Sequence, residues 1–322
     1  MRVVLVLFVW LLGLVAAVAE PCAANPDALG TSRVLSISPN EFQRIGSMQY
    51  TKTLPLNDHE VVITFDDGPI PPYSNSILDT LASQCVKATY FLVGEMAQAY
   101  PSIVRRIYNA GHSIGTHSQN HPFAFQRLSE PKFERQVDLG IASVDTALGD
   151  SKALSPFFRI PGLGRTNAIE SYLASKSLVT WSADVVADDW KRIGAREIVR
   201  RAMRRLEARG SGILLLHDIH PATVTALPML LKELKDHGYQ VVQVVADGER
   251  PQSVPEPAVS SDAKEPWPRA LPAITGQDTP DKTVLRHRVK KAISGKRRRP
   301  SVANFHEPNY GAIAKDWRQK QF

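Results

Sequence analysis

Short apolar runs alternate with longer amphipathic stretches between residues 60 and 245. The runs are rich in β-branched and aromatic residues, which favours strands. They cover residues 61–65, 88–92, 113–116, 157–160, 179–182, 213–216 and 239–245. Between them, stretches such as 133–148 and 198–206 repeat apolar residues on one helical face. This alternation predicts βα units around a parallel sheet or barrel, an α/β fold.

Two carboxylates stand side by side in the segment ITFDDGP, directly after the first run. Adjacent like charges repel, and neighbouring strand side chains point to opposite faces, so Asp66 and Asp67 gain little as ordinary core or surface residues. The residues could form a turn, because Asp and Gly favour turns. They also sit where α/β proteins build active sites, at the carboxyl end of a predicted strand.

Two histidines four positions apart, His117 and His121, follow the predicted strand at 113–116. On a helical turn both rings lie on one face and reach a single cation. Alone, this spacing also fits a structural or surface role. Together with one aspartate, the histidines form a three-ligand set that leaves a position for water, as a catalytic zinc site requires, and the other aspartate is then free to act as a base.

Candidate catalytic residues also follow three other predicted strands. Arg159 ends the run in SPFFRIPG, where a guanidinium can hold a carboxylate through a bidentate contact. Asp184 and the segment Asp188-Asp189-Trp190 follow the run at 179–182 and supply acids and an aromatic wall. His217 ends the run in LLLHD and can donate a proton if a nearby acid raises its pKa. Taken singly, Arg159 and His217 also fit a surface arginine and a hydrogen-bonded histidine at the core edge.

The flanking segments differ from this central part. Residues 1–19 place one Arg before an apolar run and end in Ala-Val-Ala, which predicts a secretory signal cleaved after Ala19, with an uncleaved membrane anchor as the alternative. Residues 20–58 show little periodicity and are expected to form an irregular extension without catalytic residues. Residues 248–322 are rich in Pro and basic clusters and are expected to be disordered.

The net charge of +7 comes entirely from the last 75 residues, because residues 1–247 hold 24 basic and 24 acidic side chains. Export argues against nucleic acid as the partner of this basic tail and favours contact with an anionic envelope surface. The two cysteines of the mature chain, Cys22 and Cys85, can form a bridge in an oxidising compartment or remain thiols.

The segments TFDDGP, HSQNHP, RIPG, DVVADDW and LLLHD, in this order and at these separations, resemble the five motifs of the polysaccharide deacetylases, also called NodB-homology domains or carbohydrate esterase family four. The resemblance covers about residues 59–247, which we take as the catalytic domain. It implies a distorted (β/α) barrel, usually with seven strands. It also implies metal-dependent removal of acetyl groups from polysaccharides, mostly from the nitrogen of N-acetylglucosamine.

The resemblance also implies a role for each candidate residue. Asp66 is then the general base, held by Arg159, and His217 is the general acid, tuned by Asp184. The ligands of zinc, or of cobalt, nickel or manganese, are Asp67, His117 and His121. The remaining candidates bind substrate: a backbone amide that stabilises the oxyanion and two side chains that line the acetyl pocket, namely Gly162, Trp190 and Leu215.

Two departures from the family pattern bear on these roles. The third motif commonly reads Arg-Pro-Pro-Tyr-Gly, so RIPG lacks an aromatic residue that helps to shape the groove. The fourth motif has one additional residue between Asp184 and Asp189, which leaves the partner of His217 open. Two rival functions also stay open: an O-acetyl polysaccharide esterase with the same machinery, and a catalytically silent glycan-binding protein.

Overall fold

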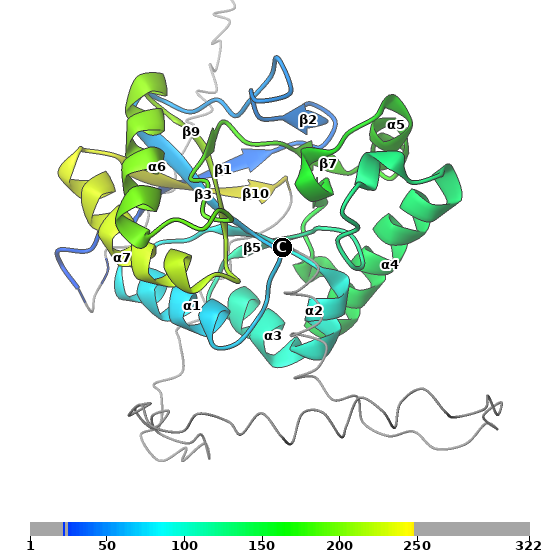
Figure 1. Ribbon diagram of the computed structural model, residues 1–322, viewed down its shortest axis with the longest axis horizontal. Helices are drawn as coiled ribbons and strands as arrows, with labels where there is room; N and C mark the ends of the chain where they lie inside the picture. Colours follow the sequence, from blue (N-terminus) through cyan, green and yellow to red (C-terminus); the bar gives the residue numbers. More distant parts are fainter. Residues whose placement is uncertain (1–21, 23–24, 248–322) are drawn as a thin grey trace, which may run out of the picture. The chain divides into compact units, whose positions relative to one another are not determined.

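The computed structural model describes Cys22 and residues 25–247. The predicted signal segment 1–19 and the predicted disordered tail 248–322 lie outside the described residues. Within them, seven parallel strands curve into a barrel (Figure 1). The strands are β3 (Glu60–Asp66), β4 (Thr89–Leu92), β5 (Ser113–Thr116), β6 (Phe157–Arg159), β7 (Val179–Trp181), β8 (Val185–Val186) and β9 (Gly212–His217). This confirms the predicted α/β fold.

The barrel is distorted at one place. Parallel ladders run from β9 through β3, β4, β5 and β6 to β7, and β8 pairs with β9. Among the described strands, no ladder joins β7 to β8. At the open edge, β7 pairs instead with the short strand β2 (Arg44–Ile45), which comes from the N-terminal segment.

Helices cover the outside of the barrel in Figure 1. They are α1 (Tyr73–Ser83), α2 (Gly94–Ala99), α3 (Pro101–Asn109), α4 (Glu130–Leu148), α5 (Asn167–Ser175), α6 (Ala195–Arg209) and α7 (Pro221–Asp236), with single 3₁₀ turns at Phe125–Arg127, Ser151–Ala153 and Pro161–Leu163. In β3, Val61, Ile63 and Phe65 pack outward with the helices, while Val62 faces the interior. Because both faces are buried, the strand is apolar without alternation. Within residues 25–247, no helix has both the length and the apolar character needed to cross a bilayer.

Two strands close the N-terminal end of the barrel. They are β1 (Thr31–Ile37) and β10 (Gln240–Ala246), which pair in parallel. β10 pairs with the start of β3, and the Ser113 hydroxyl at the start of β5 donates to the Val244 carbonyl at 2.6 Å. Val244 packs in one apolar cluster with the inward residues Val62 and Phe157. The predicted strand at 239–245 therefore forms, but it lies across the end of the barrel.

The expectation of an irregular segment at 20–58 is wrong for residues 31–37 and 44–45, which form β1 and β2. Most of β1 is only half-buried, so its sequence lacks a clear apolar period. Its partner lies far away along the chain: the Ser32 hydroxyl donates to the Val241 carbonyl at 3.0 Å. Such long-range pairing leaves no local signal in the sequence.

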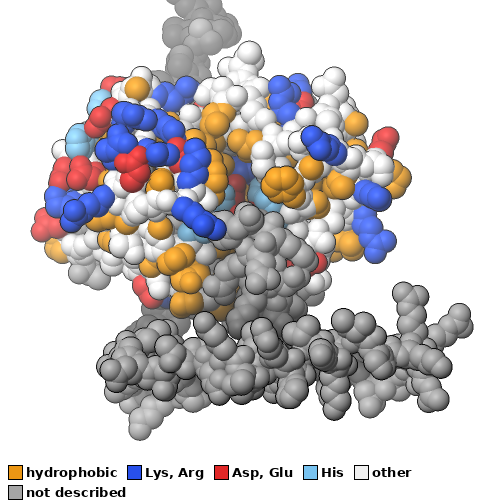
Figure 2. Space-filling view, viewed as in Figure 1, with side chains coloured by type: hydrophobic (Ala, Val, Ile, Leu, Met, Phe, Trp, Pro, Cys, Tyr) orange, Lys and Arg blue, Asp and Glu red, His pale blue; other side chains and the backbone are white. Residues whose placement is uncertain are grey.

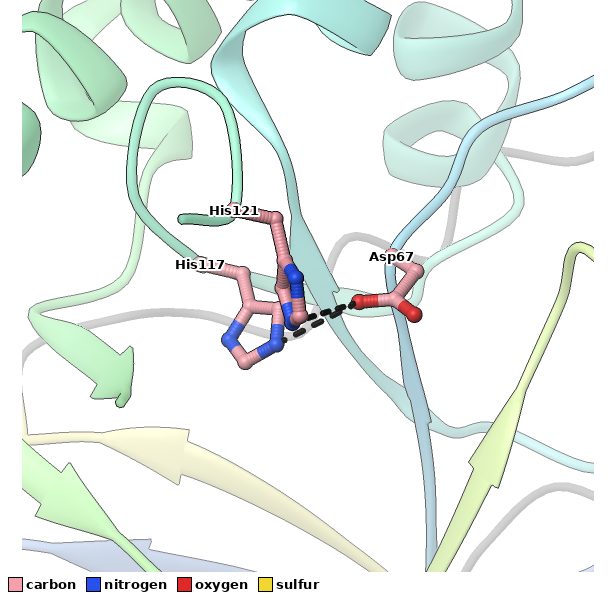
Figure 3. Close-up of side chains that lie close together, drawn as sticks. All are labelled: Asp67, His117 and His121. Carbon is pink, nitrogen blue, oxygen red and sulfur yellow. Dashed lines mark ion pairs between the residues drawn. The ribbon is translucent and has the colours of Figure 1, made fainter. Parts of the chain in front are cut away.

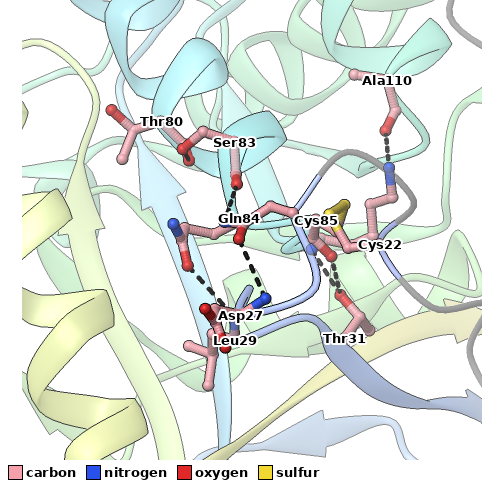
Figure 4. The surroundings of a disulfide bond; sticks show 11 residues. Cys22, Asp27, Leu29, Thr31, Thr80, Ser83, Gln84, Cys85 and Ala110 are labelled. Atoms are coloured by element: carbon pink, nitrogen blue, oxygen red, sulfur yellow. Dashed lines mark hydrogen bonds between the residues drawn. A yellow bond between two sulfur atoms is a disulfide. The ribbon is translucent and has the colours of Figure 1, made fainter.

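A disulfide joins Cys22 to Cys85, which settles the choice that the sequence left open (Figure 4). The bond ties the N-terminal segment to the turn between α1 and β4. Hydrogen bonds reinforce this attachment, because the Gly30 amide donates to the Gln84 carbonyl at 2.9 Å and the Thr31 hydroxyl donates to the Cys85 carbonyl at 3.2 Å.

Candidate metal centre and active site

Most of the predicted site residues meet at the carboxyl end of the barrel. Asp66 is the last residue of β3 and lies opposite His217, the last residue of β9, in the parallel ladder. Side chains alternate along a strand, so Asp66 faces the same interior as Thr64 and Val62. Arg159 ends β6 and is completely buried. The edge of the barrel thus brings together groups that are about 150 residues apart in the chain.

Three side chains form a group that can hold a metal ion (Figure 3). One candidate ligand atom from each of Asp67, His117 and His121 lies within 4.8 Å of the others. The Asp67 Oδ1 atom is 3.4 Å from the Nε2 atoms of both histidines. This oxygen is buried and accepts no hydrogen bond from a described residue. A buried acceptor without a donor fits a cation ligand, because burying it unpartnered costs free energy.

The charge state of Asp67 also suits a cation. Burial alone raises the pKa of this carboxyl group, but the imidazoles of His121, His117 and His217 outweigh burial and hold the pKa below its ordinary value. Asp67 is therefore an anion at neutral pH. An ionised carboxylate beside two imidazoles is a donor set that zinc accepts.

The loop that carries the histidines is not the predicted helical turn. Ser118 and His121 have φ values of +68° and +49°, in the left-handed region that residues other than glycine adopt at a cost. Close packing imposes this path: a Cβ on Gly140 of α4 would lie 2.6 Å from the Ser118 carbonyl carbon. The two rings converge because the backbone folds back on itself. The prediction that both histidines reach one cation is therefore supported, although the helical turn from which it was inferred does not form.

The tautomer of His117 is fixed by a backbone carbonyl. Its Nδ1 atom lies 2.6 Å from the Arg159 carbonyl oxygen, which can only accept, so Nδ1 carries the proton. The Nε2 atom is then a lone-pair donor that faces Asp67. Hydrogen bonds of this kind hold metal-ligating histidines in orientation.

Arg159 holds Asp66 in place. Its Nη1 atom donates to Asp66 Oδ1 at 2.7 Å and to the Thr64 hydroxyl at 2.8 Å, while Nη2 donates to the Ser182 carbonyl at 3.0 Å. The predicted bidentate contact is thus wrong, because the second nitrogen is used by the backbone. Burial lowers the pKa of Arg159, and the charge of Asp66 opposes this shift. The guanidinium also lies 4.2 Å from the centre of the Phe91 ring.

His217 is held by Asp189. The His217 Nδ1 atom lies 2.8 Å from Asp189 Oδ1, and its backbone amide donates to Oδ2 at 2.8 Å. The Thr223 hydroxyl, on α7, donates to the same Oδ2 at 2.7 Å. Burial lowers the pKa of His217, but Asp189 and then Asp67 outweigh burial and raise the pKa to about 10. The imidazole is therefore protonated at neutral pH.

The prediction that Asp184 tunes His217 is wrong. The carboxylate of Asp184 is engaged at the open edge of the barrel, where it fastens the N-terminal segment to β9. Its donors are the backbone amide and hydroxyl of Ser47 at 2.7 and 2.6 Å, the Thr53 hydroxyl at 2.9 Å and the Ile213 amide at 2.8 Å.

Asp189 was predicted only as one of several acids at this strand exit, and Thr223 was not predicted as part of the site. A signal for Asp189 was present, because it precedes Trp190 in the fourth motif, where the additional residue had left the partner of His217 open. The backbone of the intervening segment turns sharply, with Asp188 at a φ of +58°. Thr223 carries no comparable signal, because a hydroxyl in the first turn of a helix is common.

The predicted substrate-binding residues lie around these groups. The Trp190 ring is 5.6 Å from the His217 ring, edge to face, and remains 39% exposed. Leu215 precedes His217 by two residues in β9, so it faces the same side of the strand, and it is buried. Gly162 follows β6 with a φ of +58°, and no atom lies within 4 Å of the position that a Cβ would occupy. The turn therefore keeps open space beside the site.

Comparisons with known proteins agree with this geometry. The family model described as "Polysaccharide deacetylase" matches residues 54–180. A peptidoglycan-N-acetylglucosamine deacetylase of Bacillus cereus is 33% identical over 199 residues, which cover 60% of this chain and 90% of the relative.

Among solved structures, the chain is likewise similar to members of the polysaccharide deacetylase family. The peptidoglycan deacetylase Bd3279 of Bdellovibrio bacteriovorus matches with a TM-score of 0.61 at 26% identity, over 72% of this chain and 65% of that one. BA3943 of Bacillus anthracis, described as a pseudoenzyme of the same family, matches with a TM-score of 0.53 at 25% identity, over 58% of this chain and 64% of that one.

Proposed function

The chain belongs to the polysaccharide deacetylase family and is a hydrolase of carbon–nitrogen bonds other than peptide bonds, and on this premise we propose that it removes acetyl groups from N-acetylglucosamine units of a poly- or oligosaccharide. The relative in Bacillus cereus is named for peptidoglycan, so this polymer is the first to test. We propose zinc as the metal ion, with cobalt, nickel or manganese as substitutes.

The observation that carries this proposal is the placing of an acid and a base on either side of one potential metal site. Asp66 Oδ2 lies 3.9 Å from His117 Nε2, and His217 Nε2 lies 3.9 Å from Asp67 Oδ2. A cation held by Asp67, His117 and His121 would polarise the acetyl carbonyl and acidify water. Glycan binding alone would not require this arrangement.

Each flanking residue then has one proton to move. Asp66 Oδ1 is occupied by Arg159, so Oδ2 is the oxygen that takes a proton from the attacking water. His217 is protonated and anchored through Nδ1, so Nε2 is the atom that gives a proton to the leaving amine nitrogen. The backbone amide of Gly162 supplies a hydrogen bond to the developing oxyanion.

We also propose that the chain is exported and works in the periplasm or outside the cell. The pattern of residues 1–19 supports export. The Cys22–Cys85 bond supports it independently, because structural disulfides persist in oxidising compartments and are rare in the cytosol.

An acetate-release assay tests the function. The full chain, stripped of metal and then loaded with zinc, is incubated with peptidoglycan glycan strands, N-acetylchitooligosaccharides and an O-acetylated xylan. We expect acetate from the N-acetylated substrates, with activity lost on chelation and restored by zinc.

The same panel separates the rival functions. Acetate from the O-acetylated xylan alone would indicate an esterase. Binding to glycan without acetate release from any substrate would indicate a silent member of the family such as BA3943 is described to be. Either result would overturn the proposed function.

A further inference from the structure

Positive charge is concentrated in one segment of the described chain. Residues 191–209, which comprise α6 and the loop before it, carry eight basic and two acidic side chains, a net charge of +6. Since residues 1–247 are neutral as a whole, the rest of that range carries a net charge of −6. Seven of the eight cations are arginines. Such an asymmetry creates a local positive potential that attracts anions.

Four of these arginines form a row that we call the basic strip: Arg192, Arg196, Arg200 and Arg204. They recur every fourth residue, so those within α6 share one face of the helix, with a rise of about 6 Å per step. All four are exposed.

The basic strip keeps most of its charge unpaired. Arg200 binds Glu197 through two hydrogen bonds. Within the described part of the chain, Arg192, Arg196 and Arg204 form no salt bridge. The next arginines along α6, Arg201 and Arg205, are paired instead: both form salt bridges with Asp188, at 2.7 and 2.9 Å. One row of arginines thus holds the loop before α6, and the other faces solvent.

The basic strip begins beside the active site. Lys191 Nζ lies 5.7 Å from the centre of the Trp190 ring, and that ring contacts His217. Asp189, which holds His217, lies three residues before Arg192. Figure 2 shows Lys and Arg side chains gathered over α6 and reaching the edge of the central hollow, where acidic and His side chains are visible.

We propose that the basic strip binds the anionic groups of the substrate, so that the natural polymer is an N-acetylglucosamine glycan that also carries carboxylates. This inference rests on the proposed function and narrows it. Arginine suits the task because its planar guanidinium pairs with a carboxylate through two parallel hydrogen bonds. A neutral glycan such as chitin offers these side chains no charged partner.

Two soluble polymers of N-acetylglucosamine provide the test: carboxymethyl chitin, which is anionic, and glycol chitin, which is neutral. The strip variant is Arg196→Gln with Arg204→Gln, which breaks no described salt bridge. The matched control is Lys132→Gln with Arg135→Gln on α4, which removes two exposed cations that likewise form no described salt bridge, on the other side of the barrel (Figure 1). All proteins are full chains, so the basic residues after 247 are the same in each.

We expect the strip variant to lower kcat/KM for carboxymethyl chitin about fivefold, through KM, because exposed ion pairs each contribute modestly. Activity on glycol chitin and the behaviour of the control variant stay unchanged. The difference disappears in 0.5 M salt, since the Debye length is then only about 4 Å.

Equal losses on both polymers, or equal losses in the strip and control variants, would overturn the inference. If no protein releases acetate from either polymer, nor from the peptidoglycan strands and N-acetylchitooligosaccharides of the earlier assay, the proposed function fails. Binding of fluorescent carboxymethyl chitin, measured by anisotropy for the same variants, then decides the role of the strip: weaker binding by the strip variant alone supports it, and equal binding refutes it.

Discussion

The two ends of the barrel differ in what they bury: charged groups at the carboxyl end and apolar side chains at the amino end. At the carboxyl end, Asp66, Asp67 and Arg159 are buried together beside the partly buried His217, although burying charge is costly. At the amino end, β1 and β10 cover the barrel with apolar side chains such as Ile37, Val242 and Val244, and a disulfide fastens the chain next to them. One end therefore holds reactive groups in place, and the other contributes apolar burial that stabilises the fold.

The contrast shows how a fold tolerates an unfavourable site. Asp67 and His121 have left-handed backbone conformations, and Asp67 Oδ1 lacks a donor among the described residues. Strained and unpartnered groups of this kind persist only where the rest of the structure over-determines them. Changes at the carboxyl end should then alter catalysis, and changes at the amino end should alter stability.

The largest expected effect separates the two neighbouring aspartates. Asp66→Asn removes the base and should lower kcat by about 10²- to 10⁴-fold while the protein still binds zinc. Asp67→Asn should abolish turnover and also greatly weaken zinc binding. Zinc content after dialysis, measured by plasma mass spectrometry, checks the difference, with circular dichroism to show that both variants are folded. Equal loss of zinc in both would refute the division of roles.

The second prediction concerns the amino end. Cys22→Ser with Cys85→Ser should lower the free energy of unfolding by up to roughly 4 kcal/mol, because the bond closes a loop of 63 residues. The kcat and KM should not change. Urea denaturation gives the stability, and reduction of the unsubstituted protein serves as the control, since it should reproduce the effect. A parallel fall in kcat would mean that the two ends are coupled.

The smallest expected effect is a shift in the pH dependence of kcat, caused by a substitution at Asp189. Asp189→Asn removes the charge that raises the pKa of His217, so this pKa should fall by about one to three units. His217 must be protonated to act as an acid. The alkaline limb of kcat should therefore move to lower pH by the same amount.

Asp184→Asn is the matched control for that shift, because it removes the acid that the sequence favoured. It should destabilise the N-terminal segment and leave the alkaline limb in place. If Asp184→Asn moved the limb and Asp189→Asn did not, the hydrogen bond between His217 and Asp189 would have no catalytic meaning.

The sequence predicted the parts of the site that depend on local order. Asp66, Asp67, Arg159 and His217 each follow an apolar run, and in a parallel barrel such positions converge at one end. The sequence could not assign the partner of His217, because the choice between Asp184 and Asp189 depends on how the backbone turns at Asp188. A difference of a few residues in a loop decides which carboxylate meets the imidazole.

For the fold, too, the features with a local sequence pattern were predictable and those that depend on distant contacts were not. The strands β3 to β7 and β9 were predictable, because burial on both faces gives continuous apolar runs. β1 and β2 were not, since each depends on pairing with a strand far away in the chain. The disulfide also stayed open, because the sequence alone gives no distance between Cys22 and Cys85.

Arg159 serves both halves of the site at once, because its side chain holds Asp66 while its backbone carbonyl fixes the ring of His117. Any shift of β6 would therefore disturb the base and the metal ligand together, and no single substitution there can improve one while sparing the other. Evolution of new substrate preferences is then confined to segments that touch neither contact, such as residues 191–194. Arg159, Asp66 and His117 are therefore expected to be retained together, while the surrounding loops can change in sequence.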